Sequence, residues 1–124
     1  MTILVKRAYE PPGAADGFRI LVDRLWPRGV SRQDAHVDLW LRDAAPSASL
    51  RKWFGHDPAK WAGFRQRYFL ELAGRPEVIA QLEAQMDRGV VTLVYGARDT
   101  VHNNAVALKA YLEDAGRRAS AGAC

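Results

Sequence analysis

Short apolar stretches separated by helical stretches are the feature that most constrains the fold of this chain. Residues 3–9, 18–23 and 90–95 are typical of strands, and successive apolar residues at 20–22 indicate a sheet covered on both faces. Residues 36–43 alternate between apolar and polar side chains, which predicts a shorter and less buried strand. We therefore expect an α/β fold with a mainly parallel, Rossmann-like sheet of about four strands flanked by helices.

Capping residues, prolines and glycines mark the helices between these strands. Helix starts are predicted at Ser47, Asp57–Pro58, Pro76, and Asp99 or Thr100. Glycines predict helix ends at Gly55, Gly89 and Gly116. The connections between the first three strands lack a stretch long enough for a crossover helix, so an antiparallel pair there is an alternative.

The length of the chain favours a single domain. A chain of 124 residues can bury one core but not two. We expect one domain at residues 1–116 and a disordered C-terminal tail at 117–124. The only cysteine, Cys124, is the last residue and cannot staple a core.

The sequence carries no sign of a membrane span or a secretory signal. Apolar runs are only a few residues long, which is too short to cross a bilayer. Residues 3–5 are followed at once by two basic residues, whereas a secretory signal has the reverse order and is longer. We expect a cytoplasmic protein with no membrane partner, and the sequence leaves the oligomeric state open.

The basic residues are dominated by arginine. The formal net charge is +4, and fourteen of the eighteen basic residues are arginine. The planar guanidinium suits carboxylate and phosphate groups, whereas lysine acts as a point charge. A GC-rich genome would produce the same bias without a functional reason. The charge therefore permits an anionic partner but does not require one.

Polar side chains gather just after the predicted strands. Ligands of open parallel sheets bind beyond the carboxyl ends of the strands, so residues that follow different strands can share one site. Arginines suited to hold an anion lie there, at Arg7, Arg24, Arg28 and Arg98. Candidates for proton transfer are Asp23, Asp99 and His102, and Asn103 would orient the ligand. The pattern predicts a pocket for a phosphate, a nucleotide or a carboxylate, with or without catalysis.

Each of these residues also has a structural interpretation. Asp23 and Arg24 could form an ordinary ion pair at the strand end, and Asp99 could serve only as a helix cap. Other features that fit a structural role are Trp26 as a hydrophobic plug, His56, and residues 102–104 as a solvated first helical turn.

No pattern for a metal or a cofactor is present in the sequence. Three scattered histidines and one cysteine give no metal-ligand spacing. The segment "YGARD" lacks the glycines of a phosphate-binding loop or a dinucleotide fingerprint. We therefore expect no metal and no cofactor.

Three motifs, "VDRLWPRG", "APSASLRKWFGHDP" and "ARDTVHNNA", closely resemble the YeaO-like proteins, a bacterial family of unknown function. The resemblance covers roughly residues 3–113 and implies no established activity. In longer relatives the strand that corresponds to residues 90–95 leads into a segment with cysteine and histidine. Gly96 and Ala97 stand at that place here, so the resemblance does not extend to thiol chemistry.

Two other functions compete with a pocket for a small anion. A nucleic-acid-binding or transcription-associated module would use the same arginines on phosphates, with Trp26 stacked on a base. A structural partner protein would dock through the helices of residues 49–61. The arginines lie at strand ends and not along one helical face, which favours the pocket.

Overall fold

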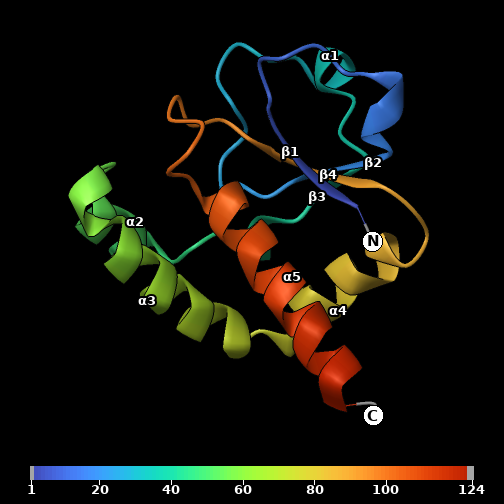
Figure 1. Cartoon of the computed structure of the whole chain (residues 1–124). Coiled ribbons are helices and arrows are strands. Elements are labelled where there is room, and N and C mark those ends of the chain that lie inside the picture. Colours follow the sequence, from blue (N-terminus) through green and yellow to red (C-terminus); the bar gives the residue numbers. More distant parts are fainter. Residues whose placement is uncertain (1, 123–124) are drawn as a thin grey trace.

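A parallel sheet forms one layer of the molecule (Figure 1). The structure is a computed structural model that describes the backbone of residues 2–122 and the side chains of residues 2–114. The strands lie in the order β1-β4-β2-β3, with bounds Ile3–Arg7 (β1), Phe18–Leu21 (β2), Leu39–Trp40 (β3) and Val91–Tyr95 (β4). Every adjacent pair is parallel, and Val91 of β4 lies opposite both Ile3 and Phe18.

The predicted α/β fold with a small, mainly parallel sheet is confirmed. β4 is inserted between β1 and β2, so the first two strands do not pair with each other and the antiparallel alternative is wrong. Residues 8–17 carry the chain back from the end of β1 to the start of β2 without an α-helix. All five residues of β4 are buried, as expected for the central strand of a sheet covered on both faces.

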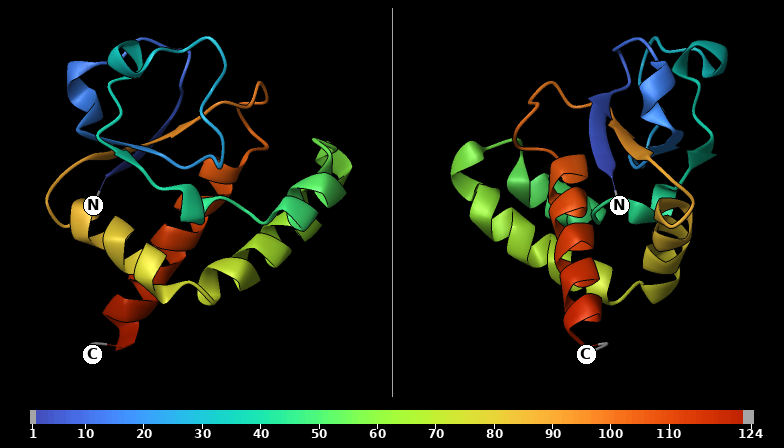
Figure 2. Two further views of the ribbon diagram at one scale, coloured as in Figure 1. Left: turned by 180° about the vertical axis from the view of Figure 1, so that it is seen from behind. Right: turned by 45° about the vertical axis from the view of Figure 1, so that its right-hand side comes forward.

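The helices are unequally distributed about the sheet. Their bounds are Arg32–Ala35 (α1), Ala48–Phe54 (α2), Trp61–Ala73 (α3), Pro76–Met86 (α4) and Asn104–Gly122 (α5). Short 3-10 turns lie at Ala14–Asp16 (η1), Arg42–Ala44 (η2) and Pro58–Lys60 (η3). Helices α2 to α5 lie on one side of the sheet, whereas α1 and long loops cover the other (Figures 1 and 2).

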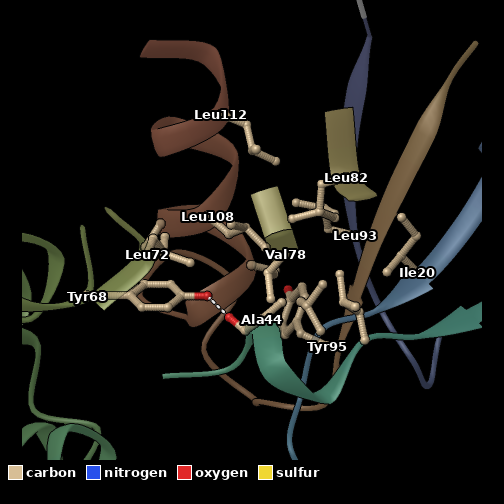
Figure 3. Close-up of a cluster of buried hydrophobic side chains, with 14 of the residues drawn as sticks. Ile20, Ala44, Tyr68, Leu72, Val78, Leu82, Leu93, Tyr95, Leu108 and Leu112 are labelled. Atoms are coloured by element: carbon tan, nitrogen blue, oxygen red, sulfur yellow. Dashed lines mark hydrogen bonds between the residues drawn. The ribbon is translucent and has the colours of Figure 1, made fainter. Parts of the chain in front are cut away.

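The main hydrophobic core lies between the sheet and helices α3, α4 and α5 (Figure 3). Fully buried side chains come from all these elements and include Ile20, Leu93, Tyr68, Leu82 and Leu108. The Tyr68 hydroxyl donates a hydrogen bond to the backbone oxygen of Ala44, which ties α3 to η2. Burial raises the pKa of Tyr68, so this hydroxyl keeps its proton and remains a donor.

The other face of the sheet is closed by loops and a buried ion pair. Arg19 of β2 is buried and its guanidinium lies 2.5 Å from the Asp16 carboxylate. The same guanidinium donates to the backbone oxygen of Ala35 over 3.2 Å and 3.0 Å. Asp16 also accepts bonds from the backbone N–H of Gly13 and the Lys6 ammonium. These bonds attach η1 and the end of α1 to the sheet.

The predicted helix starts at Ser47, Asp57 and Pro76 are confirmed. The Ser47 hydroxyl accepts a bond from the backbone N–H of Leu50, and Gly55 ends α2 in the left-handed conformation. Asp57 caps η3, which leads directly into α3.

Several boundaries differ from the sequence predictions. The strands predicted at 3–9 and 18–23 each end two residues early, and α4 ends at Met86 and not at Gly89.

Two differences have a clear physical reason. The strand expected at 36–43 is reduced to Leu39–Trp40, because η2 begins at Arg42. The last helix begins at Asn104 and not after Asp99 or Thr100, since the Asp99 carboxylate accepts bonds from N–H groups of a non-helical turn.

The predicted helix end at Gly116 is also wrong, because α5 continues to Gly122. A glycine inside a helix costs only about 1 kcal/mol relative to alanine, so it does not force a helix to end. The division into a domain at 1–116 and a tail at 117–124 stays a prediction, and residues 123 and 124 lie outside the described part of the chain.

Candidate functional site

A cavity of about 280 Å³ lies beyond the carboxyl ends of β2 and β4, between these strand ends and helices α2, α3 and α5. The residues that follow β2 and β4 line one part of it, and the first residues of α5 line another. Phe54 of α2 and Phe64 of α3 add apolar surface. This is the place where open parallel sheets commonly bind ligands.

Asp23 connects the elements around the cavity. One carboxylate oxygen accepts a bond from the Gly96 N–H at 2.8 Å, and the other accepts from the Asn104 amide at 3.1 Å. A Cβ on Gly96 would lie only 3.2 Å from the carboxylate, so glycine permits this close approach. Burial raises the pKa of Asp23, and these two bonds and the charge of Arg51 offset that effect only in part.

His102 lines the cavity, and its side chain is positioned by Asp99, which is not part of the cavity lining. The Asp99 carboxylate lies 2.9 Å from Nδ1 of His102, and the Trp61 ring contacts the imidazole edge-on at 5.3 Å. Hydrogen bonds from the backbone N–H groups of His102 and Val101, followed by the His102 side chain, lower the pKa of Asp99 to about 2. A carboxylate only accepts hydrogen bonds, so Nδ1 is the donor and Nε2 of a neutral ring is an acceptor.

Both polar atoms of the Asn103 side chain form hydrogen bonds within the protein. It is only 3% exposed, its amide donates to the backbone oxygen of Asp99 at 3.0 Å, and its carbonyl accepts from the Val106 N–H at 2.9 Å. Asn103 therefore caps α5 and fixes the turn before it, although it lines the cavity. The amide has a second N–H and the carbonyl oxygen a second lone pair, so contact with a ligand does not require these bonds to open.

Two arginines reach the cavity, one anticipated and one not. Arg24 follows β2, and Arg51 lies on α2. In the part of the chain with described side chains, neither forms an ion pair within 4.0 Å. The ordinary ion pair between Asp23 and Arg24 is therefore not formed.

Arg51, His56 and Asn104 were not among the predicted ligand residues, yet all three line the cavity. The predicted site was built from residues that follow strands, whereas Arg51 and His56 lie on the helical side of the cavity. The available signal was their place in the "LRKWFGHDP" motif, between the Ser47 cap and the Asp57 cap. The His56 ring lies 6.3 Å from that of Phe54, and its backbone adopts the left-handed conformation with φ of 57°.

The remaining predicted site residues lie outside the cavity lining. Arg7 supports the segment after β4, since its Nε donates to the backbone oxygen of Ala97 at 2.9 Å. Arg28 and Arg98 are exposed. Asp99 reaches the cavity only through His102.

The described residues contain no group of three or more histidine, cysteine, aspartate or glutamate side chains placed to hold a metal ion. Among the helices described, none combines the length and apolar character needed to cross a membrane.

Comparison with known proteins identifies the family. A family model described as "Inactive DUF488-N3 subclade" matches residues 2–124. The chain belongs to this subclade. It is 40% identical over 112 residues to "Uncharacterized protein YeaO" of Escherichia coli (strain K12), which covers 90% of this chain and 97% of that protein. It is 39% identical over 106 residues to "Uncharacterized protein Rv3073c" of Mycobacterium tuberculosis (strain ATCC 25618 / H37Rv), covering 86% and 89% of the two chains.

These matches confirm the resemblance to YeaO-like proteins that the sequence motifs indicated. No solved structure matches the chain.

Proposed function

We propose that this protein binds a small anionic molecule in the cavity beyond β2 and β4. The observation that carries the proposal is that Arg24 and Arg51, from different elements, line one cavity without an ion-pair partner within 4.0 Å in the described part of the chain. Guanidinium groups bind carboxylate and phosphate through two parallel hydrogen bonds, which favours these anions as ligands.

The position of the start of α5 also favours an anion in the cavity. Asn103 and Asn104 line the cavity, so the N-terminal end of this 19-residue helix lies at the site. The helix dipole gives that end about half a positive charge, which favours a nearby anion. The volume of the cavity, about 280 Å³, is close to that of sites that bind small molecules.

A second candidate function is acid–base catalysis on the bound molecule. Asp23 and His102 line the same cavity, and the Asp99 carboxylate holds His102 in the tautomer that leaves Nε2 as an acceptor. The description of the family model as inactive favours binding over turnover. Phosphorus NMR of a bound phosphate ester separates the two functions, because only catalysis would change the ester during prolonged incubation.

The nucleic-acid alternative has less support from the contacts of Trp26. Base stacking needs an open ring face. Trp26 is half-buried, its ring lies edge-on to Trp40 at 5.4 Å, and the Arg32 guanidinium lies over it at 5.2 Å. Its indole N–H donates to the backbone oxygen of Val30 at 2.6 Å. These contacts favour the interpretation of Trp26 as a hydrophobic plug.

Isothermal titration of the protein with inorganic phosphate, ethyl phosphate and adenosine monophosphate tests the proposed function. We expect Arg51→Ala to weaken binding about tenfold or more, because it removes a charge-assisted hydrogen-bond donor. Arg88→Ala is the matched control, since Arg88 is also exposed but lies before the amino end of β4 and outside the cavity lining. Equal losses in both variants, or no binding by the wild-type protein, would reject the pocket.

A further inference from the structure

The cavity contains an acid as well as two arginines, and this combination narrows the class of ligand. We propose that the ligand is a small zwitterion whose anionic group binds Arg24 and Arg51 and whose ammonium group binds Asp23. The inference rests on the proposed function and adds the second charge of the ligand. Amino acids and aminoalkyl phosphates are the two sources of this chemistry.

The hydrogen-bond partners of the Asp23 carboxylate inside the protein are neutral groups, although the charge of Arg51 also acts on it. Its two oxygens accept bonds from the Gly96 N–H and the Asn104 amide, and in the described part of the chain it forms no ion pair within 4.0 Å. Each carboxylate oxygen can accept a second bond. Because Asp23 also lines the cavity, that remaining capacity is open to a ligand.

The charges around the cavity disfavour a ligand that carries only one charge. A simple anion bound at Arg24 and Arg51 would be repelled by the Asp23 carboxylate, since all three side chains line the same cavity. A simple amine at Asp23 would be repelled by the two guanidinium groups. A zwitterion offsets each repulsion, because its second charge is attracted by the group that repels the first.

The protein itself leaves the Asp23 charge incompletely compensated. Burial raises the pKa of this carboxyl group, and the hydrogen bonds from Gly96 and Asn104 together with the charge of Arg51 offset the effect only in part. A bound ammonium group would supply the missing positive charge. A neutral amino group, such as that of a nucleobase, would supply a hydrogen bond but no charge, so the ammonium is favoured.

The apolar part of the lining is consistent with a short hydrocarbon spacer between the two charges. Phe54 and Phe64 line the cavity and are nearly fully buried, and their rings lie 4.5 Å apart. Leu25 adds an apolar side chain that is 73% exposed. This surface would contact the carbon atoms of the ligand without requiring polar groups there.

Matched probes test the inference on the wild-type protein. Phosphoethanolamine, ethyl phosphate and ethylamine form one set, and β-alanine, propionate and ethylamine form the other. Chemical-shift titrations should show each zwitterion binding at least about tenfold more tightly than its anion, as one charge-assisted bond predicts. The tighter of the two zwitterions identifies phosphate or carboxylate as the preferred anionic group.

Asp23→Asn provides the second arm of the test. The preference for the zwitterion over its anion should fall to near unity in this variant, while the anion alone binds more tightly than to wild type. If the circular dichroism spectrum shows that the variant does not fold, the ratio of the wild-type dissociation constants for the anion and the zwitterion tests the inference by itself.

The outcomes separate this inference from the proposed function. If the wild-type protein binds the anion as tightly as the zwitterion, the proposed anion pocket stands and the ammonium site is rejected. If it binds ethylamine as tightly as either zwitterion, the anion pocket is rejected and Asp23 stands as a cation site. If it binds none of the probes, both proposals are rejected.

Discussion

At the scale of single residues, the site holds two carboxyl groups whose surroundings act in opposite directions. Asp99 accepts two backbone N–H bonds and the bond to Nδ1 of His102, which lower its pKa to about 2. Burial instead raises the pKa of Asp23, which faces the cavity. Asp99 therefore remains ionised at neutral pH and positions His102, whereas burial shifts Asp23 toward its protonated form.

The low pKa of Asp99 leads to a prediction for acid titration. The amide resonances of Val101 and His102, which donate to this carboxylate, should move with a midpoint at about pH 2, below the ordinary value of 3.8. Because the pKa of Asp99 is lower in the folded state than in the unfolded state, these bonds stabilise the fold fully above about pH 4. This stabilisation is lost as the pH falls through the pKa of Asp99 in the folded state. His102→Ala should keep most of the shift, because the backbone donors are its largest causes. A midpoint close to 3.8 would contradict the geometry of this turn.

At the scale of secondary structure elements, helix starts were predicted well where a capping residue or a proline marks them in the sequence. Ser47, Asp57 and Pro76 mark their helices because caps and prolines act within a few residues. The strand at 36–43 and the start of α5 were predicted poorly, because tertiary bonds decide them. Backbone pairing with β2 continues from Asp38 to Leu41, after which η2 turns the chain away.

Asn103 and Thr100 provide a direct test of where α5 is capped. Asn103→Ala should lower the free energy of unfolding by about 1 to 2 kcal/mol, because the Val106 N–H loses its side-chain acceptor. Thr100→Ala should have little effect, since Thr100 is exposed and precedes the helix by several residues. Urea denaturation of the two variants gives both values. A larger loss for Thr100→Ala than for Asn103→Ala would show that the helix begins earlier than described.

At the scale of the whole molecule, the sequence predicted the cavity residues that follow strands but not those that the helices contribute. The expectation that residues after different strands meet at one edge follows from the parallel sheet, and it placed Asp23, Arg24 and His102 among the candidates. The order β1-β4-β2-β3 could not be read from the sequence, because the contact between Asp23 and Gly96 joins residues 73 positions apart. Arg51 could not be found from strand ends, since the packing of α2 brings it to the cavity.

The two faces of the sheet are closed by different means, and this difference leads to a prediction about stability. Helices bury the main apolar core on one face, whereas the loop face combines a small apolar cluster around Leu21 and Val94 with the buried pair of Arg19 and Asp16. Asp16→Ala should lower the free energy of unfolding by about 3 to 5 kcal/mol, because it leaves the Arg19 charge buried without its partner. The double variant Asp16→Ala/Arg19→Met should recover much of that loss, since it removes the uncompensated charge as well.

Lys6→Ala is the control for this pair, because the Lys6 ammonium lies 3.3 Å from Asp16 but its side chain is 24% exposed. Its effect should stay below about 1 kcal/mol, as is usual for ion pairs in contact with solvent. Urea denaturation at neutral pH measures all three variants. A double variant no more stable than Asp16→Ala would show that Arg19 stabilises the loop face through its bonds to Ala35 and not through the ion pair.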